Sequence, residues 1–216
     1  MAETCSYLPE EWWECIFKLV DDGDNNRYLE PLSLVSKQFL SITNRLRFSI
    51  TISDKTIPFI PRLFNRFPNL ASLNITRFST KSDLDKLLTN ISTFPVDIKS
   101  LTFFHCYSNI PADGLRAFSK NMKNLTSLTC YRMNKIRRND LFFLADCFPL
   151  LEELNLSYPV IATSYDFELD DDDQTLLALP KLRKINLSGN FIDRQYVNSL
   201  CKNCNLLRDV IVTDWF

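Results

Sequence analysis

The chain has 216 residues, of which 45% are hydrophobic and 24% charged, and its formal net charge is −1. This composition excludes a disordered chain, because it supplies enough apolar residues for a core, and the near-zero charge argues against a dedicated nucleic-acid binder. With 3 glycines and 1 histidine, His105, the chain leaves little room for glycine-rich phosphate loops or histidine-based catalytic and metal sites.

The opening segment, MAETCSYLPEEWW, has neither the basic nor the apolar stretch of a signal peptide. The sequence also contains no run of about 18 apolar residues that would predict a membrane span. Its 7 cysteines are an odd number without the spacing of a disulfide framework. We therefore expect reduced thiols, a cytoplasmic or nuclear location, and no membrane partner.

Residues 1–47 predict a small helical module. Pro9 suits the first turn of a helix, where its missing N–H costs nothing. Apolar residues then follow at helical spacing: Trp13, Ile16, Phe17 and Val20. After the polar segment 21–26, a second amphipathic helix is predicted from Leu32, Val35, Phe39, Ile42 and Leu46. The alternation of Phe48, Ile50 and Ile52 predicts the first strand of the following region.

Residues 48–216 contain a repeated pattern, apolar-x-x-apolar-x-apolar, at intervals of 25 to 31 residues. Six segments carry it: LASLNITRF (70–78), IKSLTFFHC (98–106), LTSLTCYRM (125–133), LEELNLSYP (151–159), LRKINLSGN (182–190) and LRDVIVTDW (207–215). The pattern and period are those of leucine-rich repeats. The sequence thus predicts an α/β solenoid of about six repeats, with parallel strands on the concave face and helices on the convex face.

Within each pattern, alternate residues point to the same face of a short strand and need a neighbouring repeat to bury them. The predicted inward residues are Leu73, Ile75, Leu101, Phe103, Leu128, Cys130, Leu154, Leu156, Ile185, Leu187, Val210 and Val212. Polar residues that can cap helix N-termini precede the segments between the strands. These are Ser82, Asp113, Asn139, Asp173 and Asp193.

The segment LPEEWWECIFKLV…LEPLSLVSKQFLSITNRLRFSITI resembles an F-box over about residues 7–48, and the whole chain resembles a plant-type F-box/leucine-rich-repeat protein. Leu8 and Pro9 match the opening Leu-Pro of the F-box motif, and Ile16 and Phe17 match its Ile-Phe pair. Residues 34–37 stand where the family commonly has Leu-Val-Cys-Lys, with Ser36 in place of the cysteine. Phe39 stands where an aromatic residue follows.

The resemblance implies a non-catalytic, substrate-recognition subunit of an SCF-type cullin–RING ubiquitin ligase. The F-box would bind a Skp-family adaptor, and the repeats would bind a protein substrate. The expected adaptor contacts are Leu8, Pro9, Ile16, Phe17, Leu32, Val35 and Phe39, some of which must instead form the internal core. The alternatives are a repeat scaffold without ligase assembly, as in a truncated or degenerate family member, and an enzyme with an unrecognised site.

Two aromatic residues, Phe104 and Tyr131, fall on solvent-facing positions of neighbouring strands. Exposed adjacent aromatics are favoured interface anchors. We expect Phe104, Tyr131, Arg132 and Tyr158 to contribute to a substrate-binding surface. The alternative is that these aromatics shield the sheet or pack on a loop.

No cofactor or metal site is expected. Cys201 and Cys204 form a lone CxxC pair without two further zinc ligands, and Cys204 falls on a buried column. The acidic run in 166–173 lacks EF-hand spacing and is expected to face the basic tract in 132–138. After its last strand the chain ends in Trp215 and Phe216, which are expected either to fold over that repeat or to mark a truncated member.

Overall fold

The structure is a computed structural model that describes residues 8–20, 28–78, 80–133, 138–160, 179–190 and 194–213. Its N-terminal part is a helical module, formed by α1 (Glu10–Val20), α2 (Leu29–Ser33) and α3 (Lys37–Leu46). The α3 helix begins after Ser36, whose backbone is extended and whose side-chain oxygen accepts the N–H of Phe39 at 3.1 Å. Ser36 is thus the N-cap of α3.

The rest of the described chain is a repeat region built on a seven-stranded, all-parallel sheet, in which the strands follow their sequence order. The strands are β1 (Ser49–Ile52), β2 (Ser72–Thr76), β3 (Ser100–Phe104), β4 (Ser127–Tyr131), β5 (Glu153–Asn155), β6 (Lys184–Asn186) and β7 (Asp209–Ile211). The connecting helices are η1 (Asp54–Phe59, a 3₁₀ helix), α4 (Ile60–Arg66), α5 (Lys81–Ile91), α6 (Ala112–Asn121), α7 (Arg138–Cys147) and α8 (Arg194–Asn203). The predicted α/β class is therefore confirmed.

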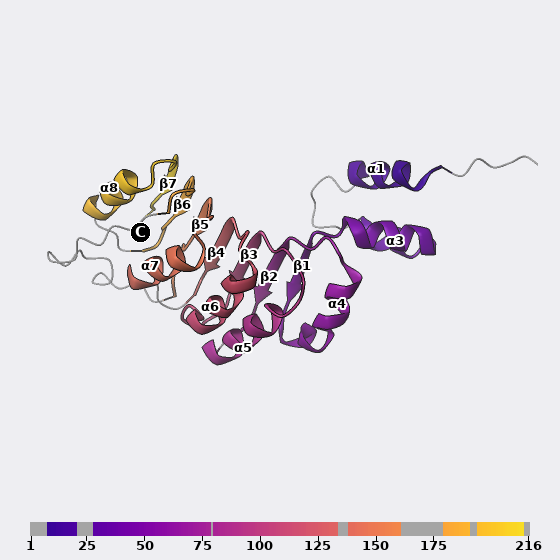
Figure 1. Cartoon of the computed structure of the whole chain (residues 1–216), viewed down its shortest axis with the longest axis horizontal. Helices are drawn as coiled ribbons and strands as arrows, with labels where there is room; N and C mark the ends of the chain where they lie inside the picture. The colour runs from indigo at the N-terminus through magenta and orange to yellow at the C-terminus, as the bar shows by residue number, and fades with distance from the viewer. Residues whose placement is uncertain are drawn as a thin grey trace, which may run out of the picture.

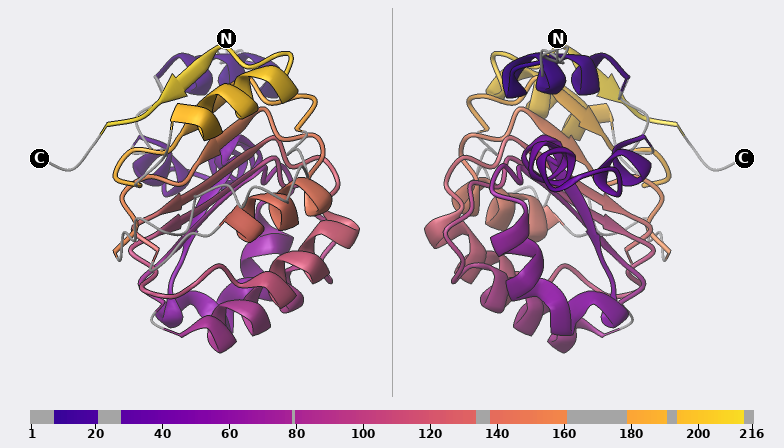
Figure 2. Two further views of the ribbon diagram at one scale, coloured as in Figure 1. Left: turned by 90° about the vertical axis from the view of Figure 1, so that its left-hand side faces the viewer. Right: turned by 90° about the vertical axis from the view of Figure 1, so that its right-hand side faces the viewer.

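The strands lie along an arc, with α4 to α7 along one side of the sheet and α1 and α3 beyond its β1 end (Figure 1). The two end views show the same layering of helices against the sheet (Figure 2). Register follows the sequence repeat, because equivalent positions pair across every strand. One row runs through Ile50, Leu73, Leu101, Leu128, Leu154, Ile185 and Val210.

The core of the repeat region follows the predicted alternation. Ten of the twelve predicted inward residues are buried. The other two lie on or beside β7, where Val210 is half-buried and Val212 is 37% exposed. Both differ from the prediction because β7 is an edge of the described sheet and receives no further strand there.

One residue in the turn after each of the strands β2 to β6 adopts a positive φ. The residues are Arg77 (66°), His105 (53°), Arg132 (56°), Tyr158 (55°) and Gly189 (77°), at equivalent positions of successive repeats. A positive φ is disfavoured for residues that carry a Cβ. Four of the five repeats nevertheless place a non-glycine residue in this turn, and only Gly189 adopts it without that cost.

A second repeated position satisfies backbone carbonyls inside the core. The Cys106 thiol donates to the carbonyl of Ile75 at 3.5 Å. At the corresponding place the Asn190 side chain donates to the carbonyls of Leu156 at 2.9 Å and Leu187 at 3.0 Å. Buried polar groups require such partners, so Cys106 has a structural role.

The three predicted helix starts that can be compared each lie two residues too late. The N-cap of α5 is Thr80, whose side chain accepts the N–H of Asp83, and Ser82 lies in the first turn. Asp113 likewise lies inside α6, and Asn139 inside α7. Several neighbouring polar residues could each cap a helix, and only backbone conformation selects one. Asp173 and Asp193 lie outside the described residues.

Candidate docking surfaces

The helical module has a small core centred on Phe17, which is 2% exposed. It packs with Leu29, Ile42 and Leu46, and half-buried Trp13, Leu32 and Phe39 close the cluster. The ring centroid of Phe39 lies 4.8 Å from both the Trp13 and the Phe17 rings. Phe17 is therefore one of the predicted residues that form the internal core, and Leu32 and Phe39 also serve mainly internal packing.

The remaining predicted adaptor contacts lie on the surface, and the structure adds others to them. Leu8, Trp12, Ile16 and Leu19 follow one another at spacings of four, four and three, which places them on one face of α1 and its lead-in. Leu34 and Val35, in the turn between α2 and α3, are also exposed. We refer to these six residues together with Pro9 as the apolar stripe.

Trp12, Leu19 and Leu34 were not among the predicted contacts. The spacing of Leu8, Trp12 and Ile16 was present in the sequence, but Trp13 and Phe17 repeat at the same interval one residue later. Sequence periodicity therefore identifies two apolar faces of α1, but it does not show which of the two faces is buried.

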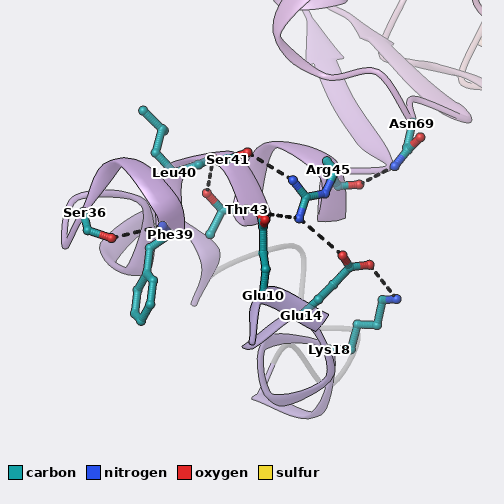
Figure 3. Close-up of polar contacts among 10 residues, drawn as sticks. All are labelled: Glu10, Glu14, Lys18, Ser36, Phe39, Leu40, Ser41, Thr43, Arg45 and Asn69. Atoms are coloured by element: carbon teal, nitrogen blue, oxygen red, sulfur yellow. Dashed lines mark hydrogen bonds and ion pairs between the residues drawn. The ribbon is translucent and has the colours of Figure 1, made fainter. Parts of the chain in front are cut away.

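Ion pairs fix α1 against α3. Arg45 of α3 contacts Glu10 at 2.8 Å and Glu14 at 3.5 Å, and Lys18 contacts Glu14 at 2.9 Å (Figure 3). The hydrogen bond from Lys18, together with the charges of Lys18 and Arg45, lowers the pKa of Glu14 despite some desolvation. The hydrogen bond to Glu10 raises the pKa of Arg45. These contacts orient the face of α1 that carries most of the apolar stripe.

The structure brings the four predicted substrate-binding residues together at the ends of β3, β4 and β5. Phe104 and Tyr131 are register partners, and their rings stack with centroids 5.1 Å apart and planes 10° apart. The Tyr131 and Tyr158 rings meet edge to face, with their centroids 5.9 Å apart. The guanidinium carbon of Arg132 lies 5.6 Å from the centre of the Tyr131 ring. We call these four residues the aromatic cluster.

Two residues absent from the prediction extend the aromatic cluster. The His105 ring lies 4.3 Å from that of Phe104, edge to face, and its Nδ1 lies 3.2 Å from the Tyr107 hydroxyl. His105, Arg132 and Tyr158 share the positive-φ position of successive repeats. Aligning the sequence repeats with one another would have revealed this equivalence, because the alignment places His105 at the same position as Arg132.

Four of the described cysteines, which are buried or half-buried, behave as structural residues. Cys204 is buried as predicted, whereas Cys201 is exposed. Burial raises the pKa of the Cys106, Cys130, Cys147 and Cys204 thiols, which disfavours their nucleophilic thiolate forms. The described residues contain no group of three or more histidine, cysteine or acidic side chains that could hold a metal ion.

Several predicted features lie outside the described residues: the acidic run in 166–173, residues 134–137 of the basic tract, Trp215 and Phe216. The expected pairing of the acidic and basic tracts therefore stays a prediction. In the part of the chain that is described, none of the helices is both long and apolar enough to span a membrane. No protein-family model matches the chain.

Proposed function

We propose that this protein is the substrate-recognition subunit of an SCF-type cullin–RING ubiquitin ligase. In this proposal the helical module is an F-box that binds a Skp-family adaptor, and the repeat region is a leucine-rich-repeat solenoid that binds a protein substrate. The protein performs no chemistry itself. It raises the effective concentration of a substrate lysine near the ubiquitin-charged enzyme, in a cytoplasmic or nuclear complex.

The observation that carries the proposal is the apolar stripe on the module whose sequence resembles an F-box. Exposed hydrophobic residues that gather on one face, as those of α1 do, mark interaction sites more often than residues that are scattered singly. Trp12 is 62% exposed and Leu34 83% exposed, although a small core lies directly beside them. A large exposed tryptophan is a favoured energetic centre of a protein interface.

A binding measurement with purified Skp-family adaptor tests the proposal. Tight binding by the unaltered chain is expected, and the Trp12→Ala/Ile16→Ala variant should bind at least tenfold more weakly. The matched control is Phe48→Ala/Phe59→Ala, which removes two exposed aromatics outside the apolar stripe and should bind normally. Circular dichroism of each variant establishes that it is folded.

The absence of adaptor binding by folded, unaltered protein would refute ligase assembly and leave the alternative, a repeat scaffold. Equal losses in the stripe and control variants would refute the assignment of the apolar stripe. For the substrate side, we propose the aromatic cluster as the binding surface. Once a substrate is known, Phe104→Ala/Tyr131→Ala should abolish its binding and leave adaptor binding unchanged.

A further inference from the structure

A cleft of about 870 Å³ lies where the helical module meets the first strands of the sheet. Its walls come from α2, α3, β1, β2 and α4, so residues far apart in the sequence converge on it. Hydroxyl and amide side chains dominate its polar lining. These are Ser33, Thr43, Asn44, Ser49, Thr51, Thr56 and Asn74.

Two arginines, Arg47 and Arg66, also line the cleft and meet at a single aromatic ring. Their guanidinium carbons lie 5.3 Å and 5.2 Å from the centre of the buried Phe67 ring. The Arg66 Nε donates to the Asn44 side chain at 3.0 Å. Within the described residues, neither guanidinium has a carboxylate within ion-pair distance, and that of Arg47 makes no hydrogen bond.

Both cations thus lie against the same ring in one recess, and no described carboxylate within ion-pair distance neutralises them. Glu30 is the acidic residue among the described lining residues, so the lining carries a net positive charge. Guanidinium groups bind oxyanions through two parallel N–H bonds, and a phosphate has enough oxygens to accept from both arginines at once. The hydroxyls of Ser49 and Thr51 and the amide of Asn44 offer further donors on the same walls.

We propose that this cleft binds a small phosphate-bearing anion, held between Arg47 and Arg66. Such a ligand contacts both the helical module and the repeat region, and it therefore stabilises their junction. The proposal does not depend on the ligase function.

Pyrophosphate and inorganic phosphate are the probes, used with the full chain at constant ionic strength in titration calorimetry and thermal unfolding. Pyrophosphate should bind and raise the melting temperature, as expected for a ligand specific to the folded state. Arg47→Gln should weaken binding at least tenfold, and Glu30→Gln should strengthen it. The matched control is Arg62→Gln, which removes the same charge from an exposed residue of α4 outside the cleft lining and should bind normally.

No binding by the unaltered chain would overturn the proposal, as would equal losses in Arg47→Gln and Arg62→Gln, which indicate a general charge effect. Succinate distinguishes the anion class, because tighter binding of this dicarboxylate than of pyrophosphate would refute a phosphate site. Arg47→Lys keeps the charge and loses the planar fork, and it should bind at an intermediate level. Because the Arg47 guanidinium makes no hydrogen bond within the described structure, replacing this side chain is not expected to unfold the protein.

Discussion

The helical module and the repeat region bury their apolar residues in different ways. In the repeat region each strand is covered by its neighbours, and one continuous core extends from Ile50 to Cys204. The helical module has a separate core of four buried residues, centred on Phe17. Stacked repeats leave few apolar side chains unpaired, whereas a three-helix module has too little interior to cover both stripes of α1. The exposed stripe is therefore a consequence of module size, and a partner can complete the burial of its side chains.

The largest expected losses of stability come from truncating a phenylalanine in either core, and they show whether the two cores unfold separately. Phe103→Ala should destabilise the repeat region by about 3–5 kcal/mol, because Phe103 is completely buried within its continuous core. Phe17→Ala should remove amide-exchange protection from α1 and α3 while the strands keep theirs, since its core is separate. Denaturant unfolding and hydrogen exchange measure both. A uniform loss of protection in Phe17→Ala would show that the two regions unfold as one unit.

Gly114 tests how closely helices of neighbouring repeats pack. A Cβ there would lie 2.7 Å from the Asp85 Cα and 3.0 Å from the Asp85 carbonyl oxygen, and the Gly114 N–H donates to the Asp85 carboxylate at 2.7 Å. Gly114→Ala should therefore destabilise the protein by about 1–3 kcal/mol, although alanine is the better helix former. Urea unfolding measures the change. A more stable variant would show that α5 and α6 separate easily.

Replacing the residue with positive φ in the turn after a strand should cause a smaller loss of stability. Gly189 has a φ of 77°, so Gly189→Ala should cost about 1 kcal/mol. Ser188→Ala, at the adjacent position, is a control for the change of side chain at this turn. Thermal unfolding compares the two, and equal shifts would argue against backbone strain as the cause.

The smallest effect concerns the ion pairs between α1 and α3. The pKa of Glu14 is lowered in the folded protein, so its contribution to stability is present above its unfolded pKa and is lost as pH falls through the folded value. Arg45→Gln should reduce stability near neutral pH by about 0.5 kcal/mol, because the groups are partly exposed. It should also flatten the stability profile between about pH 5 and 3. An unchanged profile, measured by urea unfolding across this range, would show that Arg45 does not hold Glu14 in its charged form.

The repeat pattern by itself determined the α/β class, the parallel strand order and nearly all of the sheet core. It could do so because a period-two strand fixes which side chains face inward, and a constant repeat places equivalent residues in register. Leu101 and Phe103 are buried for this reason, and Phe104 and Tyr131 stack for the same reason. The four predicted residues of the aromatic cluster follow from that register.

Only the tertiary structure decided which apolar face of α1 is buried, because Trp12 and Ile16 follow the same helical periodicity as Trp13 and Phe17. It also selected Thr80 over Ser82 as a helix cap, and brought Arg47 and Arg66 to one cleft from different elements. Periodicity records spacing along one element, whereas burial and convergence depend on what packs against that element. For this protein the sequence specified the sheet, and packing between elements created the surfaces that can bind partners.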